Sequence, residues 1–138
     1  MSHVAKVNIE IKDLDALRVA CRKVGLEFVE GQKTFRSYQR GLTCDHAIRV
    51  PQVDVERGNS NAPYEIGVIR VKSTGAYTLL VDDFAGGFGL TALSGLRAVN
   101  VVRAYATEVA TKTLTRGGYL LTGTRTKQDG TIELTFNR

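Results

Sequence analysis

The spacing of apolar residues changes from the period of a strand to the period of a helix within the first 25 residues of this sequence. Val7, Ile9 and Ile11 recur at every second position of residues 7–12, which predicts a half-buried strand. The next apolar residues recur at every third or fourth position, which predicts a helix that Asp13 caps and Gly25 ends. This helical stripe consists of Leu14, Leu17, Cys21 and Val24.

Several short segments with strand character follow the first helix, and together they predict an antiparallel meander. They cover residues 26–30, 34–40, 47–50, 64–72 and 76–81. Ser73-Thr74-Gly75 predicts a tight turn that joins the last two segments as a hairpin. Residues 51–63 contain both prolines of the chain and a run of Gly, Asn and Ser, so we expect an exposed loop insertion there.

A glycine-rich connection over residues 85–96 leads to a second helix, whose clearest part covers residues 98–114. Its apolar residues gather on one arc when successive residues are placed about 100° apart. The arc consists of Ala98, Val99, Val102, Tyr105, Ala106, Val109, Ala110 and Thr113. Thr91 and Ser94 are alternative caps near its start, and Gly117-Gly118 ends it. We expect an amphipathic packing helix.

The last twenty residues predict a hairpin around Gln128-Asp129-Gly130, for which two registers are possible. A two-residue loop places Arg125 opposite Leu134 and Lys127 opposite Ile132. A three-residue loop with a left-handed Gly130 places Arg125 opposite Glu133 and pairs three threonines with apolar residues. Those pairs are Thr126 with Ile132, Thr124 with Leu134 and Thr122 with Phe136. We favour the second register.

These elements predict an α+β fold in a single domain of residues 1–138. We expect two layers, in which two helices cover one face of an antiparallel sheet of about six or seven strands. The order along the chain is β-α-β-β-β-β-α-β-β. The face of the sheet without helices is then the natural binding surface.

The net charge of +5 is unevenly distributed along the chain. Residues 1–32 are neutral in sum, 33–72 carry +3, 73–96 carry −2, 97–127 carry +5 and 128–138 carry −1. Residues 97–127 contain six Lys and Arg but only one acidic residue, Glu108. The basic C-terminal helix and strand therefore favour an anionic partner.

Little in the sequence supports metal binding or nucleophilic catalysis. Cys44, Asp45 and His46 are chemically suitable zinc ligands, with His3 as a fourth, but no paired ligand spacing is present. In a strand, Cys44 and His46 lie roughly 7 Å apart, and no oxyanion hole is evident. We therefore expect no enzyme, cofactor or metal. No apolar run is long enough for a membrane span, and two cysteines without a leader sequence suggest the cytoplasm.

The leading functional hypothesis is a non-catalytic nucleic-acid-binding domain. In a strand, Arg36, Tyr38 and Arg40 share one face, where a ring flanked by two cations can stack a base of single-stranded nucleic acid. Arg70 and Lys72 extend this face if their strand is a neighbour. The C-terminal candidates are Arg97, Arg103, Lys112, Arg116, Arg125 and Lys127.

Two other functions remain open. In the first, the protein is an assembly module that forms a homo-oligomer through the open sheet face or an edge strand. In the second, the protein binds small anionic ligands such as nucleotides through the Gly86-Gly87-Phe88-Gly89 turn and nearby arginines. Neither a dinucleotide fingerprint nor a Walker motif is present.

The sequence also resembles the hypothetical chloroplast reading frame thirty-five family, a domain of unknown function in plastids, cyanobacteria, other bacteria and phages. The resemblance lies in Met1-Ser2-His3, the Asp13-Leu14 and Leu17 helix, Arg103-Ala104-Tyr105-Ala106, Gly118-Tyr119 and the Asp129-Gly130 hairpin. The strand pair with Tyr64–Arg70 and Tyr77–Asp83 is also similar. This resemblance implies a single domain and supplies no catalytic residues.

Overall fold

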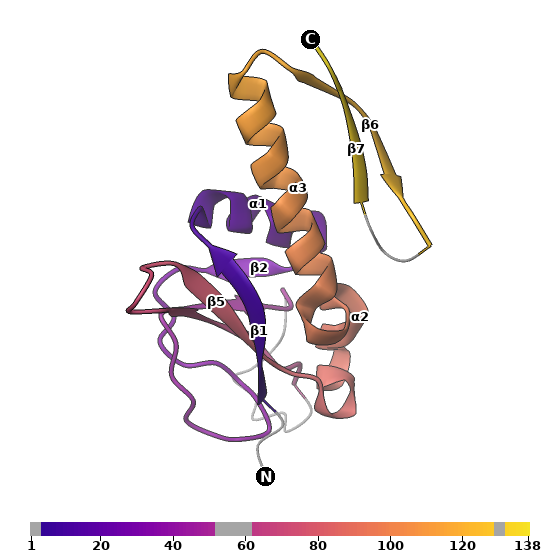
Figure 1. Cartoon of the computed structure of the whole chain (residues 1–138). Helices are drawn as coiled ribbons and strands as arrows, with labels where there is room; N and C mark the ends of the chain where they lie inside the picture. The colour runs from indigo at the N-terminus through magenta and orange to yellow at the C-terminus, as the bar shows by residue number, and fades with distance from the viewer. Residues whose placement is uncertain (1–3, 52–61, 129–131) are drawn as a thin grey trace.

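The computed structural model describes residues 4–51, 62–128 and 132–138 (Figure 1). Its elements follow the order that the sequence predicts, with one additional short helix before the long one. The strands are β1 (Val4–Ile11), β2 (Glu27–Val29), β3 (His46–Arg49), β4 (Ile66–Arg70), β5 (Tyr77–Asp82), β6 (Leu120–Thr126) and β7 (Ile132–Asn137). The α-helices are α1 (Leu14–Lys23), α2 (Leu90–Ser94) and α3 (Val99–Arg116), and two 3₁₀ turns are η1 (Phe84–Gly89) and η2 (Leu96–Ala98).

The α+β fold class is confirmed, but the strands form two sheets rather than one. Five strands form an antiparallel sheet in the order β1-β5-β4-β3-β2, and β6 and β7 form a separate two-stranded sheet. The hairpin stays separate because α3 carries the chain past the sheet before β6 begins, so that the hairpin lies beside α3 (Figure 1).

The meander is correct for β2, β3, β4 and β5, which pair in sequence order. The predicted strand over residues 34–40 is wrong, since only Thr34 forms a bridge, with Thr43. The backbone of this segment pairs elsewhere: the Arg36 amide donates to the Glu65 carboxylate at 2.9 Å, and the Tyr38 amide donates to the Asp82 carboxylate at 2.7 Å. Carboxylates from distant parts of the chain, one just before β4 and one at the end of β5, therefore replace a strand partner.

The main core lies between the sheet and the helices α1 and α3. Leu17 and Cys21 of α1 and Val101 of α3 pack against Val68 and Leu79 of the sheet, all of them fully buried. The predicted apolar arc of the second helix does not include Val101, which is buried. It does include Ala106, which is exposed. The buried face of α3 differs from the predicted arc because the helix packs mainly against α1.

A second, smaller core lies on the opposite face of the sheet. Phe35 is 3% exposed and packs there with Cys44 and Ala47. The expectation that this face is open is therefore wrong in its central part, because the connection between β2 and β3 crosses it. Gly67 makes the crossing possible: a Cβ at this position would lie 2.6 Å from the Phe35 ring.

Asp13 caps α1, as predicted. Its carboxylate accepts a hydrogen bond from the Ala16 amide at 3.0 Å and lies 2.6 Å from the Lys112 ammonium group of α3. The hydrogen bonds from Lys112 and the Ala16 backbone lower the pKa of Asp13. The Asp13 side chain thus caps the N-terminus of α1 and links α1 to α3 through the ion pair with Lys112.

Replacing Asp13 with alanine is expected to lower the free energy of unfolding by about 1 kcal/mol at neutral pH. Because the folded pKa is lowered, this contribution is complete above the ordinary value of 3.8 and is lost as the pH falls through the folded pKa. Urea titrations of both proteins at neutral pH and near pH 3 measure the difference. Asp15→Ala, an exposed substitution in the same turn, is the control, and an equal loss in both variants would contradict the capping role.

The C-terminal hairpin follows the favoured register near its loop. Thr126 faces Ile132, Thr124 faces Leu134 and Arg125 faces Glu133. The fourth predicted pair is wrong: Phe136 faces Leu121 rather than Thr122, because the register shifts between Leu121 and Gly123. The predicted loop centre, residues 129–130, lies outside the described residues, as does most of the predicted loop insertion at 51–63.

Candidate functional site

The stacking surface that the sequence suggested at residues 36–40 does not form. One Arg36 guanidinium nitrogen donates to the Pro63 carbonyl at 2.9 Å, and the Tyr38 ring lies edge-on to Phe84 with 4.9 Å between the ring centroids. Arg40 is exposed in the connection between β2 and β3. Without a strand, these three side chains do not make the expected row of cation, ring and cation.

Arg70 and Lys72 are exposed around the turn that joins β4 to β5. The Arg70 amide donates to the Asp45 carboxylate at 2.7 Å, which fixes the end of β4 to the start of β3. The Ser73-Thr74-Gly75 turn is confirmed here by the hydrogen bond from the Gly75 amide to the Val71 carbonyl.

The C-terminal arm, defined as residues 106–138, is the most exposed part of the structure. It comprises the second half of α3 and the hairpin of β6 and β7 (Figure 1). Wherever burial is described in this arm, no side chain is buried. Leu120 is 65% and Leu121 38% exposed. A two-stranded hairpin is at best marginally stable by itself, so such an arm suits contact with a partner.

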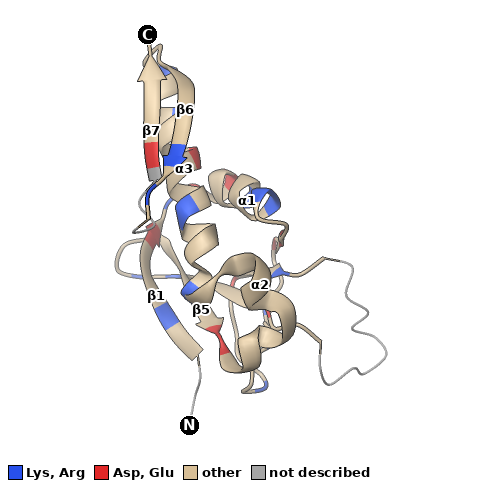
Figure 2. Cartoon of the chain, turned by 90° about the vertical axis from the view of Figure 1, so that its right-hand side faces the viewer, with Lys and Arg blue, Asp and Glu red and all other residues tan. Residues whose placement is uncertain are grey.

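Ion pairs reduce the positive charge that the sequence placed on this region. Lys112 pairs with Asp13, and Lys127 lies 3.4 Å from Glu133. Glu108 in turn pairs with Lys23 of α1 at 3.0 Å. Figure 2 shows the acidic position of β7 beside the basic position of β6, where Glu133 faces Arg125. The arm is therefore moderately rather than strongly basic.

Arginines remain exposed at both ends of the hairpin. Arg116 ends α3, and the Arg138 guanidinium lies over the Tyr119 ring, 5.1 Å from its centroid. Arg125 lies at the far end of β6. None of these three arginines forms an ion pair with another described residue. Arg97 and Arg103 precede the arm, and the Arg97 amide donates to Asp83 at 2.8 Å.

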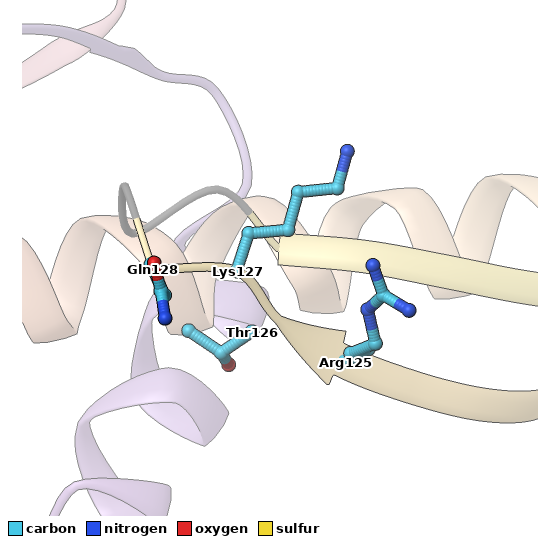
Figure 3. A pocket seen from close by; sticks show the side chains of 4 residues that line it. All are labelled: Arg125, Thr126, Lys127 and Gln128. Atoms are coloured by element: carbon cyan, nitrogen blue, oxygen red, sulfur yellow. The ribbon is translucent and has the colours of Figure 1, made fainter.

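An open hollow of about 610 Å³ lies at the far end of β6. Arg125, Thr126, Lys127 and Gln128 line it (Figure 3). Figure 3 shows the Arg125 and Lys127 side chains on one side of the ribbon, and Thr126 and Gln128 on the other. Two cations thus lie on one side of the ribbon, beside Glu133, and a hydroxyl and an amide lie on the other. The cations can hold an anionic group by charge and hydrogen bonds.

The Cys44-Asp45-His46 segment has structural partners. The Cys44 thiol donates to the Gln32 carbonyl at 3.2 Å, and His46 Nδ1 accepts from the Gly31 amide at 2.9 Å. Within the described ranges, no three His, Cys, Asp or Glu side chains lie together as a metal site would require. Burial raises the pKa of Cys44 to about 11 and that of Cys21 to about 12, so both thiols are protonated near neutral pH.

The glycine-rich connection begins with the compact 3₁₀ turn η1 and continues into α2. Ala85, Gly86, Gly87 and Phe88 all have positive φ angles, and the Gly87 carbonyl accepts from the Tyr64 amide at 2.8 Å. Gly87 is required here, since a Cβ would lie 2.9 Å from that of Leu90. Neither Thr91 nor Ser94 caps α2 or α3 with its side chain.

The sequence did not indicate Arg138 and Tyr119 as neighbours. In the predicted register, Arg138 faces Leu120, and only the shift near Thr122 brings it to Tyr119. The pairing of Lys112 with Asp13 was also missed, since the two residues are 99 positions apart. The pair forms because α3 packs against α1, and no local sequence pattern predicts it.

Together the fold and the arm define a class: an α+β protein with a five-stranded sheet, helices on one face and a separate, exposed, moderately basic β-ribbon. Comparison of the chain with protein-family models, curated protein sequences and solved structures finds no match. The resemblance to the hypothetical chloroplast reading frame thirty-five family therefore stays a prediction. In the described ranges, no helix combines the length and hydropathy of a membrane span.

Proposed function

We propose that the protein is a non-catalytic nucleic-acid-binding protein that contacts phosphates through its C-terminal arm. The observation that carries this proposal is the exposed β6–β7 ribbon with arginines at both ends. Arg116 and Arg138 lie near its base and Arg125 at its other end. Exposed guanidinium groups form forked hydrogen bonds with phosphate oxygens.

Duplex nucleic acid suits this surface better than single strands. The major groove of B-form DNA accepts a two-stranded β-ribbon, and β6 spans about 20 Å, roughly six base pairs of duplex. Single-strand binding instead relies on rings that stack against successive bases. Tyr38 is 54% exposed but lies outside the arm, edge-on to Phe84, and Tyr119 lies under the Arg138 guanidinium, so these rings do not form a row along the arm.

Fluorescence anisotropy with a labelled 20-base-pair DNA duplex, beginning near 50 mM salt, tests the proposal. If three arginines each displace counterions, the logarithm of the affinity falls with the logarithm of salt concentration with a slope of about −3. The same titration with single-stranded DNA and RNA separates the two kinds of ligand. Absence of binding at low salt, or affinity that does not depend on salt, contradicts the proposal.

Arg116→Ala and Arg125→Ala are each expected to weaken duplex binding about fivefold and to reduce the salt slope by about one unit. Each substitution removes one phosphate contact from an exposed position, so the fold is preserved. Arg22→Ala on α1 makes the same charge change outside the arm and serves as the matched control. Equal losses in all three variants would indicate an effect of net charge alone and no specific role for the arm.

A further inference from the structure

β1 is the longer of the two strands at the edges of the five-stranded sheet. It has eight residues, whereas β2 at the opposite edge has three. Within the described residues, β1 pairs with β5 alone, so the outer side of its middle residues, Lys6 to Glu10, presents unpaired backbone N–H and C=O groups. In Figure 2, β1 lies at the margin of the molecule. A second strand can add to such an edge.

The middle of β1 departs from regular pairing with β5. Val4 to Val7 face β5 in a regular register, and pairing resumes at Ile11 with Tyr77. Between these pairs β1 bulges: three residues, Asn8, Ile9 and Glu10, lie opposite the single β5 residue Thr78, whose hydroxyl donates to the Val7 carbonyl at 2.7 Å. Val7 and Ile9 remain only partly buried on the helix side, while Ile11 is fully buried. The centre of this strand thus has both backbone groups and apolar side chains that a partner would cover.

The charges of β1 are complementary to those of a second β1. Lys6 and Glu10 are its two charged residues, both exposed, and each lies two positions from Asn8. In an antiparallel pair related by a two-fold axis at Asn8, Lys6 of each copy faces Glu10 of the other. Val7 then faces Ile9 on the helix side. Opposite charges and apolar residues that face one another stabilise such a pair.

From this arrangement we propose that the protein forms a two-fold symmetric dimer through antiparallel pairing of β1 with β1 of a second copy. The surface is self-complementary, as an isologous interface requires. The two five-stranded sheets become one ten-stranded sheet, in which Val7 and Ile9 gain cover. This inference does not depend on nucleic-acid binding, and it is tested without nucleic acid.

An engineered disulfide at the proposed axis tests the dimer directly. In the pair, Asn8 faces its own copy at a Cα distance of about 5 Å, which a disulfide can bridge. Asn8→Cys is expected to give a disulfide-linked dimer under mild oxidation. Lys6→Cys is the control: it is exposed on the same face, but it lies about 13 Å from its own copy, so it is expected not to cross-link. The native thiols, Cys21 and Cys44, are both buried.

A charge exchange tests the register by an independent measurement. Glu10→Lys places two pairs of lysines face to face and is expected to raise the dimer dissociation constant about tenfold or more. The double variant with Lys6→Glu and Glu10→Lys restores both pairs and is expected to regain the affinity. Analytical ultracentrifugation over a range of concentrations measures both values. A monomer at all concentrations, or cross-linking of both cysteine variants alike, overturns the proposal.

Discussion

Replacing Gly67 with alanine is expected to destabilise the protein by about 2 kcal/mol, because the new methyl group collides with a buried aromatic ring. Its Cβ would lie 2.6 Å from two atoms of the Phe35 ring, and Phe35 is 3% exposed. The ring has little room to withdraw, since Ala47 and Cys44 pack around it. Urea denaturation measures the loss. Gly123→Ala is the control, since its Cβ would make only an ordinary contact of 3.7 Å with Thr135.

A double-mutant cycle shows whether the Phe35 ring is the cause. Phe35→Ala alone is expected to cost about 3 kcal/mol through the cavity it leaves. In the double variant the collision disappears, so Gly67→Ala adds almost nothing to that cost, and the two substitutions are coupled by about 2 kcal/mol. Additive losses would mean that the connection between β2 and β3 does not cover this face of the sheet.

Replacing Asp82 with alanine is expected to cost about 3 kcal/mol, the second large effect. Asp82 is fully buried, and its two carboxylate oxygens accept from the Tyr38 amide at 2.7 Å and the Phe84 amide at 2.9 Å. Removing the carboxylate breaks both hydrogen bonds, and a hydrogen bond to a charged group contributes about 1.5–3 kcal/mol. Urea denaturation measures the total, and hydrogen exchange is expected to show faster exchange of the Tyr38 amide.

Asp82→Asn is the matched control for this site. It keeps the shape of the side chain and one oxygen that can accept a hydrogen bond, so its expected cost is about half that of alanine. A loss below about 0.5 kcal/mol in Asp82→Ala, in the range of ordinary surface substitutions, would show that the 36–40 segment is not held by this carboxylate.

The segment with Arg36, Tyr38 and Arg40 shows where local pattern fails. Alternation of residue types correctly predicted β1 and most of the meander, because each of those strands has a neighbour to complete its ladder. The same alternation was misleading over 34–40, where Glu65 and Asp82 satisfy the amides instead. Those carboxylates are 29 and 44 positions away from their partners, a separation that no short sequence window includes.

In the C-terminal arm, the local sequence pattern predicts one part of the strand register correctly and another part wrongly. The predicted facing of Arg125 and Glu133 is correct, because turn geometry fixes register near the loop. The shift near Thr122 then changes which residues meet at the base, and it brings Arg138 to Tyr119. The charge sum over residues 97–127 located an excess of cations but not their partners, and Asp13 and Glu133 neutralise two of them.

By itself, the sequence determined the kinds of element and their order, the cap of α1 and the turn between β4 and β5, because periodicity, capping and turn chemistry act over a few residues. Only the tertiary structure decided that the hairpin leaves the sheet, that a connection covers the second face and that β1 remains an eight-residue edge. These outcomes depend on where distant segments find burial and hydrogen-bond partners, and that is settled by the packing of the whole chain.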